Sequence, residues 1–390
     1  MNTLFGIAES SAPAEVAAKL ASVRGLMAEI GAPGVVLTST GAVAWLSAGL
    51  TNRIEAGSTA SAMWIVVTPT DAVALTTNVE RPRIEAEHDL PARGLRLAEI
   101  EWFAGGAGFV AAACEVAGHP AGELASDAHA GFGIDADDAL AARRLALLPS
   151  EQERLSALAI DAAGALELTL RHWRPGDRDL DLQARIAAEL ELVGAFGACL
   201  IVGGDERVER FRHPLAVGAP VLRLAMAVVV AERGGLHAAA TRMACCDDLP
   251  DTVRAAWLDA LGVETRMLAA SRAGATYGGV LSACDEAYAE AGHPGAWREH
   301  YQGGPIAYRQ REFEIVPSQR EQRWYRQAIE TGHAVAWNPS VAGGGKSEDT
   351  FLIEDGGPRC LTDTGVWPQV AVADGLERTA ILDIATGAAA

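Results

Sequence analysis

The sequence predicts two domains, an α/β lobe over residues 1–148 and an α+β domain over residues 149–390. Helical and strand-like patterns alternate up to about Leu148, as they do in an α/β domain. Two long helical stretches, a strand hairpin, two more helices and a strand-rich last third follow. At 390 residues, 49% of them hydrophobic, the chain has enough apolar surface for two separate cores.

In the first domain the apolar residues from about Glu15 recur at helical spacing up to Gly31, which suits a helix C-cap. Short apolar runs bounded by turn residues follow this helix. We therefore expect strands at 34–38, around 44–46, at 63–68 and at 72–76.

The second domain begins where Ser150 and Glu153 form an S-x-x-E pattern, which predicts a capping box at the start of a long helix. Another helix is expected after Asp177. Two apolar runs, 221–231 and 236–244, predict a hairpin that turns at Gly234–Gly235. Two further helices are expected, at about 252–271 and 277–291.

The charge balance excludes some classes of partner. A formal net charge of −19 argues against nucleic acid and anionic membranes, because both need a basic face. We expect no signal peptide, since residues 1–19 lack a basic segment followed by an apolar run. The six cysteines form no CxxC pair, which is typical of reduced thiols. These features predict a soluble cytoplasmic protein.

Six motifs occur in the second domain in a fixed order. They are Arg174-Pro-Gly, His213-Pro-Leu, Gly235-Leu-His-Ala-Ala-Ala-Thr-Arg, Ala273-Gly-Ala-Thr, His300-Tyr-Gln-Gly-Gly-Pro-Ile-Ala and Lys346-Ser-Glu-Asp-Thr-Phe-Leu-Ile. In this order they resemble the motifs of the "pita-bread" superfamily of creatinase, prolidase, aminopeptidase P and methionine aminopeptidase. The resemblance implies a curved, mostly antiparallel sheet covered by helices, preceded by the smaller lobe of creatinase and aminopeptidase P.

The metallopeptidases of this superfamily hold two divalent cations with two Asp, one His and two Glu. Hard cations need such anionic oxygens, and the metals generate the attacking hydroxide. At the matching positions this chain has Val228, Ala239, Gly304, Asn338 and Glu348. One carboxylate and one amide do not make a dinuclear site. We therefore expect no catalytic metal and no other cofactor.

The resemblance to creatinase, which hydrolyses a C–N bond without metal, implies roles for what remains. His213 stands at the place of the catalytic histidine, and imidazole exchanges protons near neutral pH. Glu348 matches a carboxylate that orients the substrate. Lys346 is predicted to pair with Glu348, because residues i and i+2 share one face of a strand. The alternatives are a surface-loop histidine and a purely structural Lys–Glu pair.

Further residues are predicted to bind substrate. Arg311 and Glu312 stand where the peptidases have a substrate-binding His followed by Glu, and Tyr308 belongs to the same segment. An arginine there suits a carboxylate or a carbonyl oxygen, although a solvated surface charge is equally compatible. Thr241 keeps the peptidase pattern where creatinase has a glutamate, which argues against creatine as substrate. Asn338, at a former ligand position, is predicted to line the same pocket.

In the first lobe, Thr51-Asn-Arg-Ile-Glu-Ala-Gly matches a creatinase segment whose arginine enters the active site of the partner subunit. The resemblance therefore implies a homodimer in which Arg53 clamps the carboxylate of the substrate.

These residues predict a metal-independent, creatinase-like hydrolase of a C–N bond (amide, urea or guanidino type) in a small carboxylate-bearing molecule. The same groups would also serve a lyase or a cyclase, since fold alone does not define the reaction. A different class, a catalytically inactive binding module for peptides or small molecules, is the main alternative. An aminopeptidase with one metal would require Glu348, His237 and His333 to converge.

Overall fold

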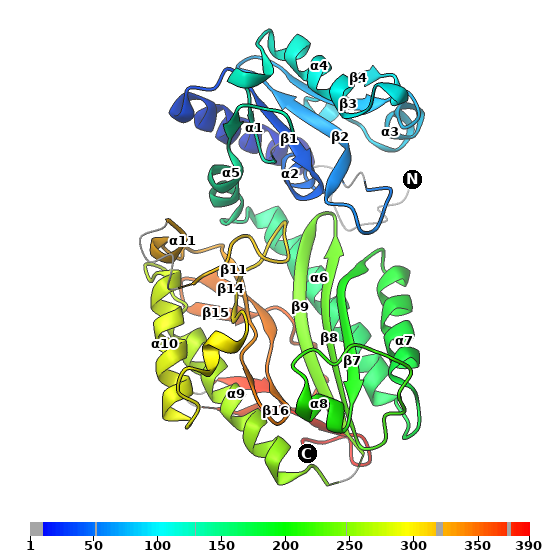
Figure 1. Ribbon diagram of the computed structural model, residues 1–390, viewed down its shortest axis with the longest axis vertical. Helices are drawn as coiled ribbons and strands as arrows, with labels where there is room; N and C mark the ends of the chain where they lie inside the picture. Colours follow the sequence, from blue (N-terminus) through cyan, green and yellow to red (C-terminus); the bar gives the residue numbers. More distant parts are fainter. Residues whose placement is uncertain (1–10, 51–52, 129, 247, 317–322, 373–375) are drawn as a thin grey trace. The chain divides into compact units, whose positions relative to one another are not determined.

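A six-stranded mixed sheet organises the first of two units into which the chain divides. This unit comprises Met1–Glu151 and Gly234–Leu236, and the second comprises Gln152–Arg233 and His237–Ala390. The computed structural model describes residues 11–50, 53–128, 130–246, 248–316, 323–372 and 376–390 (Figure 1). The boundary predicted after residue 148 lies close to the point where the first unit ends, and it stays a prediction.

The first unit is an α/β domain with the sheet order β4-β3-β2-β1-β5-β6. β1 runs antiparallel to β2 and parallel to β5, and β3 runs parallel to β4. Its elements are α1 (Ala12–Ile30), β1 (Val35–Ser39), α2 (Thr40–Leu46), β2 (Ala60–Val67), β3 (Ala72–Thr77), α3 (Arg81–Glu87), β4 (Arg96–Ile100), α4 (Gly105–Ala117), β5 (Ala125–Ser126), β6 (Ile134–Asp135) and α5 (Asp137–Arg144), with short 3-10 turns at Pro91–Arg93, Trp102–Ala104 and Ala121–Glu123.

The expected first helix and three of the four expected strands of this unit are confirmed. The strand expected around 44–46 is wrong, because these residues belong to α2. The Ser39 side chain caps α2 by accepting a hydrogen bond from the Ala42 amide at 3.2 Å. All residues of α2 are buried, so no polar face marks its helical period. A short apolar run of this kind does not distinguish a buried helix from a buried strand.

A buried ammonium joins α1 to the segment that ends this unit. Lys19 Nζ donates to Glu15 Oε1 at 2.6 Å, to Glu151 Oε1 at 2.7 Å and to the Trp45 carbonyl at 2.7 Å. The side chains of Lys19, Glu15 and Glu151 are all buried. Such a cluster tolerates burial because each charge has a partner.

The second unit is built on two four-stranded sheets, ordered β18-β9-β8-β7 and β10-β11-β14-β15. Its helices are α6 (Pro149–Arg171), which begins at the end of the first unit, α7 (Asp179–Leu192), α8 (Glu206–Arg210), α9 (Asp251–Ala270), α10 (Tyr277–Glu290), the 3-10 turn Ala296–Glu299 and α11 (Arg323–Arg326). Its strands are β7 (Phe196–Gly204), β8 (Leu224–Arg233), β9 (Leu236–Cys245), β10 (Gly303–Pro305), β11 (Ala334–Trp337), β12 (Ser340–Val341), β13 (Gly345–Lys346), β14 (Asp349–Glu354), β15 (Gly357–Cys360), β16 (Gln369–Ala371), β17 (Glu377–Thr379) and β18 (Leu382–Asp383).

Helices flank both sheets of the second unit. α7 lies along β7, and α9 and α10 lie on the side of β11, β14 and β15 (Figure 1). The two sheets meet where the Thr241 amide donates to the Glu348 carbonyl at 2.9 Å. The hairpin predicted at Gly234–Gly235 is confirmed, and both glycines have the positive φ that a tight two-residue turn requires. The predicted helices after Asp177 and at about 252–271 and 277–291 are also confirmed.

The capping box predicted for Ser150 and Glu153 is wrong. Pro149 occupies the first position of α6, which moves the N-cap to Leu148. The Leu148 amide accordingly donates to Glu151 Oε2 at 2.8 Å, while the Ser150 hydroxyl donates to Glu15 at 2.5 Å. Across the described residues we find no helix with the length and apolarity needed to cross a membrane.

Replacing Lys19 by methionine tests the buried cluster of the first unit. The change leaves the carboxylates of Glu15 and Glu151 buried without their shared cation, so we expect a loss of about 3–5 kcal/mol in the free energy of unfolding. Urea denaturation measures it. Arg96→Met is the matched control, since the Arg96–Asp71 pair is exposed and its loss should cost less than about 1 kcal/mol. Equal effects of the two changes would contradict this account.

Candidate active site

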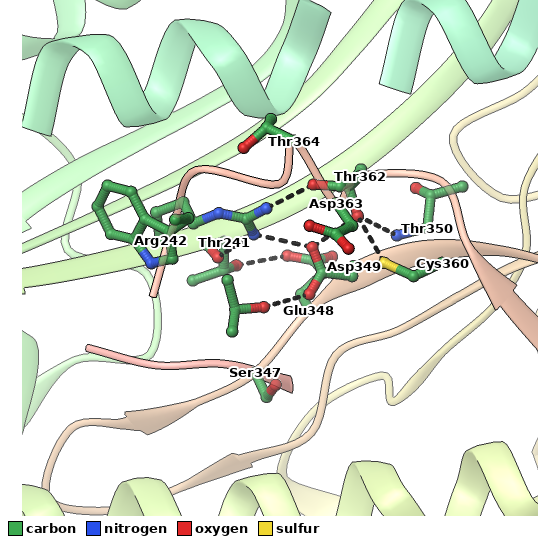
Figure 2. A network of polar contacts seen from close by, with 12 residues as sticks. Thr241, Arg242, Ser347, Glu348, Asp349, Thr350, Cys360, Thr362, Asp363 and Thr364 are labelled. Atoms are coloured by element: carbon green, nitrogen blue, oxygen red, sulfur yellow. Dashed lines mark hydrogen bonds and ion pairs between the residues drawn. The ribbon is translucent and has the colours of Figure 1, made fainter. Parts of the chain in front are cut away.

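The guanidinium of Arg242 on β9 bonds to three other segments of the second unit, and Figure 2 shows its bonds to Asp349 and Thr362. It donates to Glu167 Oε1 on α6 at 2.9 Å, to Asp349 Oδ1 on β14 at 2.8 Å and to the Thr362 carbonyl at 2.8 Å. Arg242, Glu167 and Asp349 are buried. Because Arg242 follows Thr241 and Asp349 follows Glu348, these bonds fix the two strand segments that carry the site.

A second arginine completes this network. Arg378 on β17 lies 3.0 Å from Asp349 Oδ2 and 2.5 Å from Glu264 Oε2. Burial alone would raise the pKa of Asp349, but Arg242 and Arg378 outweigh it and hold that pKa below its usual value. For Glu264 burial dominates and raises the pKa.

Glu348 and Lys346 form a buried pair next to this network. Thr241 Oγ1 donates to Glu348 Oε2 at 2.8 Å, and Lys346 Nζ lies 3.8 Å from the same oxygen. The side chains of Lys346 and Glu348 are only 7% and 5% exposed. A carboxylate buried to this degree requires a cation nearby, and Lys346 supplies it.

His213 lies on the loop between α8 and β8, its side chain is exposed, and its predicted place in the site stays a prediction. Partial burial of the ring lowers its pKa first, and the charges of Lys346, Arg311 and Arg212 lower it further, while Glu348 acts in the opposite direction. The imidazole is therefore neutral at pH 7, which is the state that accepts a proton.

Three polar residues of the site were not predicted from the sequence. His300 Nε2 lies 2.8 Å from Ser340 Oγ, and the same hydroxyl accepts a hydrogen bond from Arg212 Nε at 3.1 Å. Burial first, and then the charge of Lys346, lowers the pKa of His300 to about 4. His300 is the first residue of one of the six motifs, and Arg212 directly precedes His213. These two sequence positions could have indicated that both residues lie near the site.

Comparisons with known proteins agree with this architecture. No family model and no curated protein matches the sequence. Among solved structures, a prolidase from Pyrococcus horikoshii superposes with a TM-score of 0.70 at 15% identity, covering 89% of this chain and 98% of that one. An Xaa-Pro dipeptidase from Bacillus anthracis has a TM-score of 0.68, 18% identity and the same coverages. For proline aminopeptidase P II from Yersinia pestis the values are 0.65 and 13%, with coverages of 90% and 96%.

The chain has the pita-bread fold of these prolidase, dipeptidase and aminopeptidase P structures. The predicted fold class, an α/β lobe followed by an α+β pita-bread domain, is thereby confirmed.

The residues that the motif resemblance matches to metal ligands do not fit a dinuclear centre. Val228 packs in an apolar cluster with Met226, Met243 and Trp257, and Ala239 is buried on β9. Gly304 lacks a side chain, and Asn338 contributes only a neutral amide beside Glu348. Throughout the described part of the chain no three His, Cys, Asp or Glu side chains are grouped as metal ligands, so Glu348, His237 and His333 do not converge.

The other predicted site residues differ in their surroundings. Arg311 is exposed, pairs with Glu314 at 3.2 Å and covers the Tyr301 ring at 4.5 Å, yet it is close enough to His213 to lower its pKa. Glu312 accepts a hydrogen bond from the Tyr308 amide at 2.8 Å, which stabilises the turn that follows β10. Arg53 belongs to the first unit, and its predicted role in a partner subunit stays a prediction.

Asp349→Asn tests the network that supports the site. Removing the carboxylate leaves Arg242 and Arg378 without their shared partner, so we expect a loss of about 3–5 kcal/mol in unfolding free energy at pH 7. Because the folded-state pKa of Asp349 is lowered, the wild type loses this stabilisation as the pH falls below about 4, and the difference should shrink there. Urea denaturation across pH, with exposed Asp181→Asn as control, measures both effects. A difference that stays constant with pH would contradict this assignment.

Lys346→Met tests the electrostatic coupling within the site. Lys346 lowers the pKa of His213, so its removal should raise that pKa. An NMR titration of the histidine Cε1 protons measures the shift, and Arg178→Gln, an exposed change, is the control. An unchanged or lower pKa of His213 would show that the two groups are not coupled.

Proposed function

We propose that this protein is a metal-independent hydrolase that cleaves a C–N bond in a small carboxylate-bearing molecule. The observation that carries the proposal is the Lys346–Glu348 pair. It puts an ammonium beside the one carboxylate retained from a metal-binding set whose other four positions hold Val, Ala, Gly and Asn. The structural neighbours are named as peptidases and dipeptidases, and a peptide bond is itself a C–N bond.

His213 would transfer the proton of the reaction. Its neutral imidazole takes a proton from the attacking water while the new C–O bond forms. The resulting imidazolium then protonates the departing nitrogen as the C–N bond breaks, which restores the neutral ring. The lowered pKa favours the first step at neutral pH and makes the imidazolium a stronger acid for the second.

Glu348 and Asn338 would orient the scissile group. Thr241 and Lys346 contact Oε2 of Glu348, and no described residue donates a hydrogen bond to Oε1. Asn338 Oδ1 is buried and finds no hydrogen-bond donor among the described residues. A buried acceptor without a donor costs free energy, so a substrate N–H placed there would gain a bond that the free protein lacks.

The dimer and the location in the cytoplasm are parts of the same proposal. A homodimer would bring Arg53 to the site of the partner subunit, as the resemblance to creatinase implies. The net charge of −19 on each chain supports a substrate that is neither nucleic acid nor lipid.

Turnover of small amides, ureas and guanidino acids tests the activity directly. We expect the wild type to hydrolyse at least one class, and His213→Ala to lower kcat by about 10²–10⁴-fold with little change in KM. Because the active base is the neutral ring, kcat/KM should fall as the pH drops through the lowered pKa of His213. His172→Ala, an exposed histidine at the end of α6, is the control.

Two results would contradict the proposal. Equal activity of wild type and His213→Ala would remove this histidine from the mechanism. Saturable binding of these compounds without turnover would favour the alternative of a catalytically inactive binding module.

A further inference from the structure

A small cavity opens beside the Lys346–Glu348 pair within the second unit. It has a volume of about 60 Å³, room for a few water molecules or one compact ion. The segment 208–212, which includes the end of α8, and the segment 340–346 line most of it, together with Met226. Three of its lining side chains are cationic, Arg210, Arg212 and Lys346, and one is anionic, Glu209. In a chain of net charge −19, a lining with a formal charge of +2 is unusual.

Lys346 provides the main observation. The chain has only two lysines, Lys19 and Lys346, and both are buried. The Lys19 ammonium makes three contacts of 2.6–2.7 Å, whereas the Lys346 ammonium lies 3.8 Å from Glu348 and forms no hydrogen bond with any described residue. An ammonium has three donors, so Lys346 Nζ has donors available for an acceptor that enters the cavity.

Arg212 approaches the same space from the other side. Its Nε donates to Ser340 Oγ at 3.1 Å, and its Nη2 bonds to Glu299. These two bonds fix the guanidinium plane, while Nη1 forms no hydrogen bond with a described residue. A fixed guanidinium and a nearby ammonium are a favourable combination for binding an oxyanion.

The hairpin between β12 and β13 leaves the cavity open. Gly343, Gly344 and Gly345 carry no side chains that would fill it. A Cβ at residue 345 would lie 2.0 Å from the Ala256 carbonyl oxygen, so the hairpin packs closely against α9 only with glycine there.

We propose that this cavity is an oxyanion subsite in which Lys346 and Arg212 bind the carboxylate of the substrate. The assignment to a substrate rests on the proposed function, but the binding of a compact oxyanion does not. The proposal places the carboxylate of the substrate at Lys346 and Arg212, and so replaces the roles predicted for Arg53 and Arg311. Arg311 is exposed and already pairs with Glu314. After burial, the charges of Lys346 and Arg212 both act to lower the pKa of His213.

NMR of protein labelled with [ε-15N]lysine tests the subsite, since two lysines give two ammonium signals. We expect acetate to shift the Lys346 signal saturably and to leave the Lys19 signal in place, with sodium chloride matching the ionic strength. Arg212→Gln should weaken acetate binding by about 10-fold, the loss of one charge-assisted bond. The exposed change Arg178→Gln should leave it unchanged. The Lys19 signal and the amide spectrum show whether each variant is folded.

Separate titrations with inorganic phosphate identify the source of the oxyanion. Binding of acetate at least as tight as that of phosphate supports a carboxylate, while phosphate binding more than about 10-fold tighter would overturn that part of the proposal. No saturable shift of Lys346, or equal effects of Arg212→Gln and Arg178→Gln, would overturn the subsite itself. If the His213→Ala variant still binds acetate, the oxyanion subsite is supported even if the protein hydrolyses no substrate.

Discussion

The bond between Arg242 and Asp349 is the interaction on which the candidate site depends. It joins β9 to β14 at the two positions next to Thr241 and Glu348, and Glu167 and Thr362 hold the same guanidinium from α6 and from the loop after β15. The bonds are buried, so their loss would leave charges without solvent or partner. Thr241 and Glu348 consequently meet at 2.8 Å as a result of the framework and not of their own attraction alone.

Within this framework the candidate site contains the carboxylate of Glu348, whose negative charge is balanced by a lysine instead of a metal ion. In the metallopeptidases of this fold, divalent cations balance several acidic ligands. Of the residues that the motif resemblance matches to those ligands, four have an apolar side chain, no side chain or a neutral one, and a lysine two residues from Glu348 provides one positive charge. A lysine in place of metal ions still balances the charge of the buried carboxylate. The apolar residues can then pack in the core, as Val228 does with Met226 and Trp257.

Much of the fold was predictable because long periodic patterns and six ordered motifs define it. The sequence did not reveal α2, whose residues are all buried and therefore lack a polar face. Nor did it reveal the partners of Arg242, since Glu167 lies 75 residues away and Arg378, the second arginine, joins from β17. For the site, the motifs indicated His213, Lys346 and Glu348, whereas Arg212 and His300 become partners only through Ser340, which tertiary packing brings between them.

Metal content is the measurement that tests the central claim most directly. Purified without metal-affinity steps and analysed by inductively coupled plasma mass spectrometry, the protein should contain well under one zinc, manganese, iron or cobalt ion per chain, and chelator should not alter its turnover. The donor set of Glu348 and Asn338 is too weak for a dinuclear centre. One or two tightly held ions per chain, with activity lost on chelation, would contradict the account.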